Sequence, residues 1–303
     1  PINFRLHPQE IQYILQHCGA KVVCAHADFL ETVEAIRGSC PAVEHYVALE
    51  GAREGWLDYE DLLGAETGEP DRQEIDERDL LTINYTSGTT ARPKGVMMTH
   101  RNAYMNVVGT LIHLPMTPGD RYLWTLPMFH ANAWSLPYAV PMCGGTLVFP
   151  GARLDGASVY ELIDGEGVTF SAGVPTVWLM LLDYLAHSGN TLDGMSRVVC
   201  GGSAVPRSMI QAFEEQHGVR MIQAWGMTEM SPLGTVGTFK RGMAELPAQQ
   251  RYDIQGKAGR CLYGVEMKIV DDAGHEMPRD GVAFGQLMVR GPWVATGYFR
   301  GEG

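Results

Sequence analysis

The residues best suited to chemistry form one dense run of hydroxyl side chains and glycines: Tyr85-Thr86-Ser87-Gly88-Thr89-Thr90-Ala91-Arg92-Pro93-Lys94-Gly95. The run follows one apolar segment and leads into another, Val96-Met97-Met98. Small residues let backbone N–H groups approach phosphate oxygens, and the hydroxyl groups are further donors. Lys94 adds a point positive charge. The run therefore indicates a phosphate-binding loop rather than an ordinary polar turn between two strands.

The P-loop of nucleoside triphosphatases is the main alternative for such a run. That motif needs Gly directly before the Lys and Ser or Thr directly after it, and it opens a helix. Here Pro93 precedes Lys94, Gly95 follows it, and the next segment has the pattern of a strand. The sequence excludes this class on both counts.

A second candidate segment is Gln223-Ala224-Trp225-Gly226-Met227-Thr228-Glu229. The carboxylate of Glu229 is a hard oxygen ligand of the kind that Mg²⁺ prefers when it bridges triphosphate oxygens. Taken alone, however, a glutamate is more often a solvated surface carboxylate.

Three further segments could border a ligand. Gly201-Gly202-Ser203-Ala204-Val205-Pro206 follows an apolar run, and paired glycines allow a flat ligand to touch the backbone, although such a pair is usually a plain turn. Pro127-Met128-Phe129-His130-Ala131-Asn132-Ala133-Trp134 contains a histidine that we assign to pocket shape rather than to proton transfer. Gly173 to Trp178 fits a pocket wall and an ordinary helix start equally well.

The elements that must position these residues alternate in type. Helical patterns are expected at residues 8–18, 27–38, 102–113, 157–166, 176–187 and 206–217, and strands at 21–26, 45–49, 80–85, 96–99, 121–126, 146–149, 168–171 and 197–200. Strands that alternate with helices predict an α/β fold of layered, mostly parallel β-sheets with packed helices.

The pattern changes near Gly234. Residues 264–277 are expected to form a β-hairpin around Asp271-Asp272-Ala273-Gly274, and strand-like runs follow at 286–290 and 294–299. We therefore expect an α/β body over 1–233, incomplete at its N-terminus, and a small C-terminal β subdomain over 234–303. The acidic, apolar-poor segment 64–79 is expected to be a surface connection.

The bulk composition limits the partners and the compartment. A formal net charge of −12 disfavours nucleic acid and anionic membranes, so bound phosphate needs local donors and a metal ion. The six cysteines show no C-x-x-C spacing, which favours structural thiols in a reducing compartment. The first residues lack the apolar stretch of a signal peptide, and no segment is apolar and long enough to span a membrane. We expect a cytoplasmic protein.

The two strongest segments together resemble the signatures of the adenylate-forming (AMP-binding) superfamily, which includes acyl-CoA synthetases, firefly luciferase and peptide-synthetase adenylation domains. In the first signature, Ala91 stands where the family usually has Gly, and in the second Trp225 stands where it usually has Tyr. The resemblance runs from Pro1 to the last residue and is closest to bacterial medium- and long-chain fatty-acyl-CoA synthetases. It implies ATP, Mg²⁺ and coenzyme A as cofactors or co-substrates.

The resemblance also implies residue roles. Thr86 and Glu229 are expected to hold Mg²⁺, and Thr86, Lys94, Thr228 and Glu229 to be catalytic, with Thr228 on the α-phosphate. Trp134 corresponds to a residue that closes an acyl tunnel until ATP binds. The residues expected to bind the nucleotide are Thr86, Ser87, Gly88, Thr89, Thr90, Lys94, Ala131, Trp134, Gly202, Ser203, Ala204, Gln223, Ala224, Trp225, Gly226 and Thr228.

The implied reaction is attack of a carboxylate on the α-phosphorus of ATP, followed by transfer of the acyl group to the coenzyme A thiol. An amino-acid activator should place an acidic residue in its pocket, yet residues 129–137 and 173–181 contain no Asp or Glu. A hydrophobic, fatty acid is therefore the expected substrate. Its chain length stays open, and so does the oligomeric state, with a homodimer as one option.

Two alternatives remain. An adenylating relative with another acceptor, such as a peptide synthetase or a luciferase, shares the same signatures. Alternatively, the chain is a nucleotide- or acyl-adenylate-binding fragment without turnover. Family members continue to a ribose-binding aspartate and a mobile C-terminal domain with a catalytic lysine, and the resemblance places all three outside this sequence. Residues 1–8 resemble an internal segment of such enzymes, so both ends are expected to be truncated. We expect ATP–pyrophosphate exchange by this chain to be at least about 100-fold slower than by a full-length relative.

Overall fold

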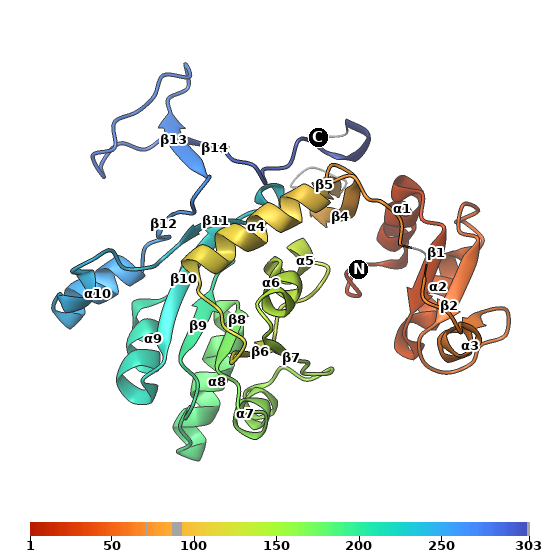
Figure 1. Ribbon diagram of the computed structural model, residues 1–303, viewed down its shortest axis with the longest axis horizontal. Helices are drawn as coiled ribbons and strands as arrows, with labels where there is room; N and C mark the ends of the chain where they lie inside the picture. Colours follow the sequence, from red (N-terminus) through yellow and green to blue (C-terminus); the bar gives the residue numbers. More distant parts are fainter. Residues whose placement is uncertain (71, 87–92, 302–303) are drawn as a thin grey trace. The chain divides into compact units, whose positions relative to one another are not determined.

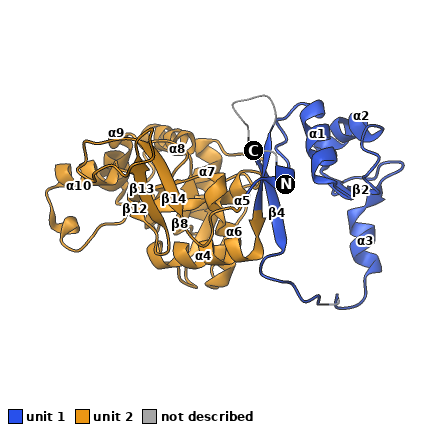
Figure 2. Cartoon of the chain, turned by 90° about the horizontal axis from the view of Figure 1, so that it is seen from above, with its two compact units in different colours: residues 1–97, 297–303 blue, residues 98–296 orange. Residues whose placement is uncertain are grey.

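The computed structural model describes residues 1–70, 72–86 and 93–301. The chain divides into two compact units, residues 1–97 with 297–303, and residues 98–296 (Figure 2). The fold is α/β with a mostly parallel central sheet and packed helices, which confirms the predicted fold class. The predicted boundary between residues 233 and 234 stays a prediction, and the compact units divide the chain elsewhere.

Unit 1 opens with a small parallel sheet in the order β1-β2-β3. Helix α1 begins directly after His7, whose side chain forms a capping box with Glu10, and it ends at Gly19, where φ is +68°. Ile11, Ile14 and Leu15 form its buried face. The elements are α1 (Pro8–Cys18), β1 (Val22–Ala25), η1 (Ala27–Phe29), α2 (Leu30–Arg37), β2 (His45–Ala48), β3 (Leu57–Asp58) and α3 (Tyr59–Ala65).

A second, two-stranded sheet of unit 1 is formed by β4 (Leu80–Thr86) and β5 (Lys94–Thr99), which flank the predicted phosphate loop. The surface connection was predicted for residues 64–79. Gly64 and Ala65 belong to α3, whereas the described residues between 66 and 79 are exposed and contain no helix or strand. The chain passes into unit 2 within β5, between Met97 and Met98.

The central sheet of unit 2 has seven strands in the order β12-β11-β10-β9-β8-β6-β7. Strands β6 to β10 are parallel, whereas β11 and β12 are antiparallel to their neighbours. Along the chain, the parallel strands are therefore arranged 2-1-3-4-5, one of the common doubly wound orders. Their bounds are β6 (Arg121–Trp124), β7 (Thr146–Val148), β8 (Phe170–Gly173), β9 (Arg197–Cys200), β10 (Arg220–Gly226), β11 (Leu233–Val236) and β12 (Arg260–Cys261).

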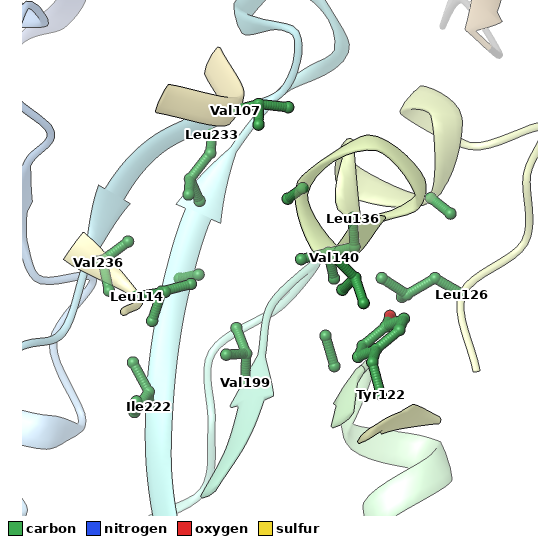
Figure 3. Close-up of a cluster of buried hydrophobic side chains, with 14 of the residues drawn as sticks. Val107, Leu114, Tyr122, Leu126, Leu136, Val140, Val199, Ile222, Leu233 and Val236 are labelled. Carbon is green, nitrogen blue, oxygen red and sulfur yellow. The ribbon is translucent and has the colours of Figure 1, made fainter. Parts of the chain in front are cut away.

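Helices cover both faces of this sheet, and the side chains of each strand alternate between them. Tyr122 and Trp124 belong to one core with α4 (His100–His113) and α6 (Leu136–Met142) (Figures 1 and 3). Leu123, between them in sequence, belongs to the core on the other face. That core is formed with α7 (Gly156–Gly165), α8 (Pro175–Ser188), α9 (Arg207–Gln211) and α10 (Ala248–Gln255).

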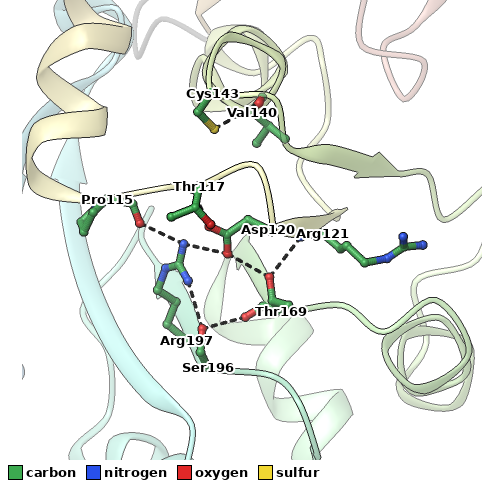
Figure 4. Close-up of polar contacts among 9 residues, drawn as sticks. All are labelled: Pro115, Thr117, Asp120, Arg121, Val140, Cys143, Thr169, Ser196 and Arg197. Carbon is green, nitrogen blue, oxygen red and sulfur yellow. Dashed lines mark hydrogen bonds and ion pairs between the residues drawn. The ribbon is translucent and has the colours of Figure 1, made fainter.

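A buried ion pair fastens the amino ends of three parallel strands (Figure 4). Arg197, the first residue of β9, contacts Asp120, which directly precedes β6, at 3.1 Å between Nη2 and Oδ1. Asp120 also accepts hydrogen bonds from the Thr117 N–H (2.8 Å) and from the Thr169 hydroxyl (2.9 Å), just before β8. These donors outweigh burial and hold the pKa of the Asp120 carboxyl below its ordinary value.

The C-terminal part differs from the sequence-based expectation. β13 (Glu266–Val270) pairs with β14 (Gln286–Arg290) rather than with the residues just after the turn at 271–274. The expected hairpin over 264–277 is reduced to a single bridge between Val270 and Glu276. The expected strand at 294–299 is also absent apart from a bridge between Tyr298 and Val96, so both expectations were wrong. A turn signal fixes where the chain reverses, but it does not fix which later segment supplies the partner strand.

Among the described residues, no helix combines the length and the apolarity needed to cross a lipid bilayer.

Candidate functional site

The predicted site segments of unit 2 lie at the carboxyl ends of parallel strands or directly after them. Strands β6, β8, β9 and β10 end at Trp124, Gly173, Cys200 and Gly226. Because these strands are parallel, the segments after them lie at the same edge of the sheet (Figure 1). The strand order reverses at β6, whose neighbours β7 and β8 lie on opposite sides, and ligands of doubly wound sheets bind at such a point.

The turn that carries Glu229 begins directly after β10. Residues 228–230 form a 3₁₀ turn, closed by hydrogen bonds from Met230 N to Met227 O (2.8 Å) and from Ser231 N to Thr228 O (3.1 Å). The Ala295 N–H donates to the carbonyl oxygen of Glu229 at 2.6 Å. Both Thr228 and Glu229 are half-buried, so their side chains are accessible at the carboxyl edge of the sheet.

Gly226 is required by the close approach of two backbone segments. A Cβ atom at this position would overlap the carbonyl oxygen of Pro232. The Met227 N–H donates to that same oxygen at 3.0 Å. The glycine of the second signature therefore lets the chain fold back tightly after β10, which presents Thr228 and Glu229 on a short turn.

The glycine pair after β9 lies against the same edge. A Cβ atom on Gly201 would come within 2.9 Å of Cη2 of Trp134 and 3.0 Å of the carbonyl oxygen of Ala224. Gly202 has φ of +83°, which favours glycine. The structure thus brings together three segments that the sequence assigned to the nucleotide and acyl sites.

The side chain of Gln223 holds the segment that contains Ser203 and Ala204. Gln223 is buried, and its Oε1 accepts a hydrogen bond from Val205 N at 3.3 Å. This contact fixes the end of the segment after Gly202 against β10. Ser203 and Ala204 themselves are exposed.

Trp134 stands on an unusual left-handed turn, α5 (Ala131–Trp134). Five consecutive residues other than glycine, Ala131 to Ser135, have φ between +45° and +60°. Each such residue costs on the order of 1–2 kcal/mol relative to the right-handed form. Ala131, Asn132, Ala133 and Ser135 are nonetheless buried, so packing holds the turn in this form.

The ionisable groups nearest these segments show no activated nucleophile. Partial desolvation lowers the pKa of His130. Burial raises the pKa of the Cys200 thiol to about 12.

Unit 1 carries the other predicted site residues. Thr86 is the last residue of β4, and Lys94 is the first residue of β5. The ammonium group of Lys94 lies 5.1 Å from the ring centroid of Tyr298, within the range of a cation–π contact. Ser87, Gly88, Thr89 and Thr90 lie outside the described residues. Thr86 and Glu229 belong to different units, each described by itself, so a Mg²⁺ ion shared between them stays a prediction.

The donor set in unit 2 fits magnesium bound together with a triphosphate. Within residues 1–70, 72–86 and 93–301, no group of three or more His, Cys, Asp or Glu side chains could hold a metal ion by itself. A single carboxylate such as that of Glu229 is what Mg²⁺ uses when substrate phosphates and water complete its shell.

Sequence reasoning missed the residues that hold the Glu229 turn. Ser135 donates from its hydroxyl to the carbonyl oxygen of Ser231 at 3.0 Å. Asn106 is buried against the same turn from α4. A signal was present, because Asn102, Asn106 and Thr110 form a polar stripe at four-residue spacing on the buried face of a helix.

The comparisons decide the family. The sequence profile of the family described as "AMP-binding enzyme" matches residues 1–299. This chain belongs to that family. Its similarity to a long-chain-fatty-acid–CoA ligase of Thermus thermophilus is 43% identity over 303 residues, which cover 99% of this chain and 55% of the relative. Its similarity to a 3-methylmercaptopropionyl-CoA ligase of Ruegeria lacuscaerulensis is 41% over 310 residues, covering 99% and 57%.

Among solved structures, an anthranilate CoA ligase in complex with anthranoyl-AMP matches this AMP-binding enzyme with a TM-score of 0.86. The two are 27% identical, and the match covers 99% of this chain and 56% of the other. The chain thus spans little more than half the length of the relatives it matches. These relatives are named for a fatty acid, a sulfur-containing acid and an aromatic acid. Membership of the family alone therefore does not identify the acid that this chain would use.

Proposed function

We propose that the protein activates a hydrophobic carboxylic acid with ATP, as an acyl-adenylate, and transfers the acyl group to coenzyme A. The observation that carries the proposal is the meeting of Trp134, Gly201 and Ala224 at the carboxyl edge of the parallel sheet, one short turn from Thr228 and Glu229. An aromatic ring beside bare backbone can border a flat base, while a carboxylate and a hydroxyl beside it suit a phosphate–metal group.

Each of the four site residues has a separate task in this proposal. Mg²⁺, when bound, neutralises charge on the phosphates. The carboxylate of Glu229 is proposed to hold that ion, and Thr228 to donate a hydrogen bond to the α-phosphate. Thr86 and Lys94 are proposed to add a hydroxyl ligand for the ion and positive charge for the phosphates. Positive potential is needed because one anion must approach another.

A fatty acid is the substrate class we favour. The pocket segments 129–137 and 173–181 contain no acidic side chain that could meet a substrate ammonium group. Apolar side chains such as Trp134 and Val174, which are only partly buried, suit an aliphatic tail. We further propose a cytoplasmic location, and a homodimer stays a prediction.

The test is ATP–pyrophosphate exchange by this protein, with acids from acetate to palmitate and with amino acids as the contrast. The proposal predicts that aliphatic acids support exchange, and that coenzyme A then yields acyl-CoA and AMP. Exchange that depends on an amino acid, or adenylate formation without thioester, would replace it by one of the other adenylating functions.

A second candidate is specific to this chain: a nucleotide-binding fragment without turnover. It is favoured by the coverage of only 55% and 57% of the relatives. For this chain we expect exchange at least about 100-fold below that of a full-length relative, because the loss of one transition-state contact can have this effect. Equal rates would remove this candidate.

A further inference from the structure

Asn106 is a polar residue in the middle of α4, and it is completely buried, with an exposed fraction of 0%. Its neighbour Val107 belongs to the apolar core of the sheet (Figure 3). Gly109, on the same helix, is in contact range of the ring of Trp293. A buried amide is tolerated in such surroundings only when its donor and acceptor are both satisfied.

The partners of this amide all lie around the Glu229 turn. With the amide oriented so that both ends meet complementary groups, its nitrogen donates to Ser231 O at 3.1 Å. Its oxygen accepts from Leu233 N and from the indole N–H of Trp293, both at 3.2 Å. Ser231 follows Glu229 by two residues, and Trp293 precedes by two residues the Ala295 N–H that donates to Glu229 O.

These contacts act on the end of the Glu229 turn that leads into β11 and on the carbonyl of Glu229. The turn leaves β10 at Gly226 and returns into β11 at Leu233. Asn106 fixes the returning end, and the segment 293–295, which the amide also contacts, fixes the carbonyl of Glu229 itself. Helix α4, which carries none of the predicted site residues, therefore helps to hold the Glu229 backbone in position through Asn106.

We propose that Asn106 is a positioning residue for the Thr228–Glu229 turn and sets how well the turn accepts the magnesium complex of a nucleotide. The inference rests on the proposed function, since it takes Glu229 as the magnesium ligand. Asn106 itself touches no substrate. Groups behind a metal ligand can change metal affinity by about 10- to 100-fold without contacting the metal.

The test measures the affinity of the 303-residue chain for ATP by calorimetry, once in the presence of Mg²⁺ and once in the presence of EDTA. All variants are measured well below their melting temperatures. Asn106→Leu keeps the shape and removes all three hydrogen bonds. Thr110→Val is the matched control, because Thr110 lies one turn along α4, is buried, and its hydroxyl has no hydrogen-bond partner among the described residues. Val107→Ala is a second control that lowers stability without removing a polar contact.

We expect the gain in ATP affinity that Mg²⁺ brings to fall by about tenfold in Asn106→Leu and to stay unchanged in both controls. A purely structural role for Asn106 would lower the melting temperature, as Val107→Ala does, and leave the magnesium gain intact. That result would overturn the inference.

Two further outcomes are decisive. If Asn106→Leu does not fold, Trp293→Phe replaces it, since this change removes one donor to the amide oxygen while keeping an aromatic ring. A smaller loss of the magnesium gain supports the inference, and an unchanged gain overturns it. If the unmodified chain shows no magnesium gain at all, the proposed function itself fails, and the inference fails with it.

Discussion

The hydroxyl of Ser135 donates a 3.0 Å hydrogen bond to the carbonyl oxygen of Ser231. Ser135 ends the left-handed turn that carries Trp134, and Ser231 ends the 3₁₀ turn that carries Glu229. Both serines are buried and both have φ near +60°. Two turns from distant parts of the sequence, one predicted for the acyl group and one for the metal, therefore share one buried contact.

Ser135→Ala should lower the free energy of unfolding of unit 2 by about 1 kcal/mol, because a buried hydrogen bond is lost but the Ser231 carbonyl keeps a second donor. Urea unfolding followed by tryptophan fluorescence measures this, since five of the six tryptophans, all except Trp56, lie in unit 2. Ser208→Ala, exposed on α9, is the control and should change stability by less than about 0.5 kcal/mol. Equal losses of unfolding free energy in the two variants would contradict a stabilising hydrogen bond between Ser135 and Ser231.

Replacing alanine by glycine should have different effects on backbone strain in the left-handed turn and in a right-handed helix. Ala133 (φ +49°) and Ala139, in helix α6, are 1% and 0% exposed, so replacement by Gly deletes the same buried methyl group at each site. Glycine relieves strain only at Ala133, so Ala139→Gly should be the more destabilising change by about 1–2 kcal/mol. The measurement is the same urea titration. A more destabilised Ala133→Gly variant would show that the turn is not held left-handed in solution.

Much of the fold could be predicted because hydrophobic periodicity and strand–helix alternation act locally. Residues 197–200 were predicted to form a strand, and β9 has those bounds, while the expected helix at 102–113 lies within α4. The partner of β13 could not be predicted, since strand pairing depends on which distant segment packs there. The left-handed turn at 131–135 has no sequence signal either, because its alanines prefer the right-handed form and only the surrounding core holds them otherwise.

Some residues of the candidate site could be predicted from the sequence, and others could not. Glu229, Thr228 and the glycines of the signatures could be named from the sequence, because metal ligands and close backbone approaches require particular residue types. Asn106 could not be named as a partner of that turn, since a buried polar residue in a helix shows only that some partner exists. Ser135 and Ser231 are ordinary in sequence, and only the tertiary structure brings them together.

The buried ion pair between Asp120 and Arg197 should contribute far more to stability than a surface pair. Arg197→Met leaves the buried Asp120 carboxylate without its cation and should cost about 3–5 kcal/mol. Arg207→Met removes an exposed pair with Asp253 and should cost at most about 1 kcal/mol. Urea unfolding of both variants is the measurement. Similar losses for the two variants would contradict the role assigned to the buried pair in joining the strands.

Stability should fall on mild acidification through His217. Desolvation lowers the pKa of this imidazole in the folded state, so the unfolded chain takes up a proton first as the pH falls. Its contribution is therefore fully present above the ordinary histidine pKa and is lost as the pH falls through that value toward the lowered folded pKa. His217→Gln should flatten the dependence of the melting temperature on pH in this range. Ser208→Ala, an exposed change without a titratable group, should leave it unchanged, and a reversed order of the two variants would contradict the desolvation of His217.

The proposed activity requires that Thr86 and Glu229 act on the same magnesium–triphosphate, and a double-mutant cycle tests this most directly. The affinity for ATP with Mg²⁺ is measured for the unmodified chain, Thr86→Val, Glu229→Gln and the double variant, with Glu161→Gln, exposed on α7, as the control. If both side chains hold one metal ion, the double variant should lose little more affinity than Glu229→Gln alone, because the ion is already lost. If the two losses simply add, the side chains act independently, and the shared magnesium site is contradicted.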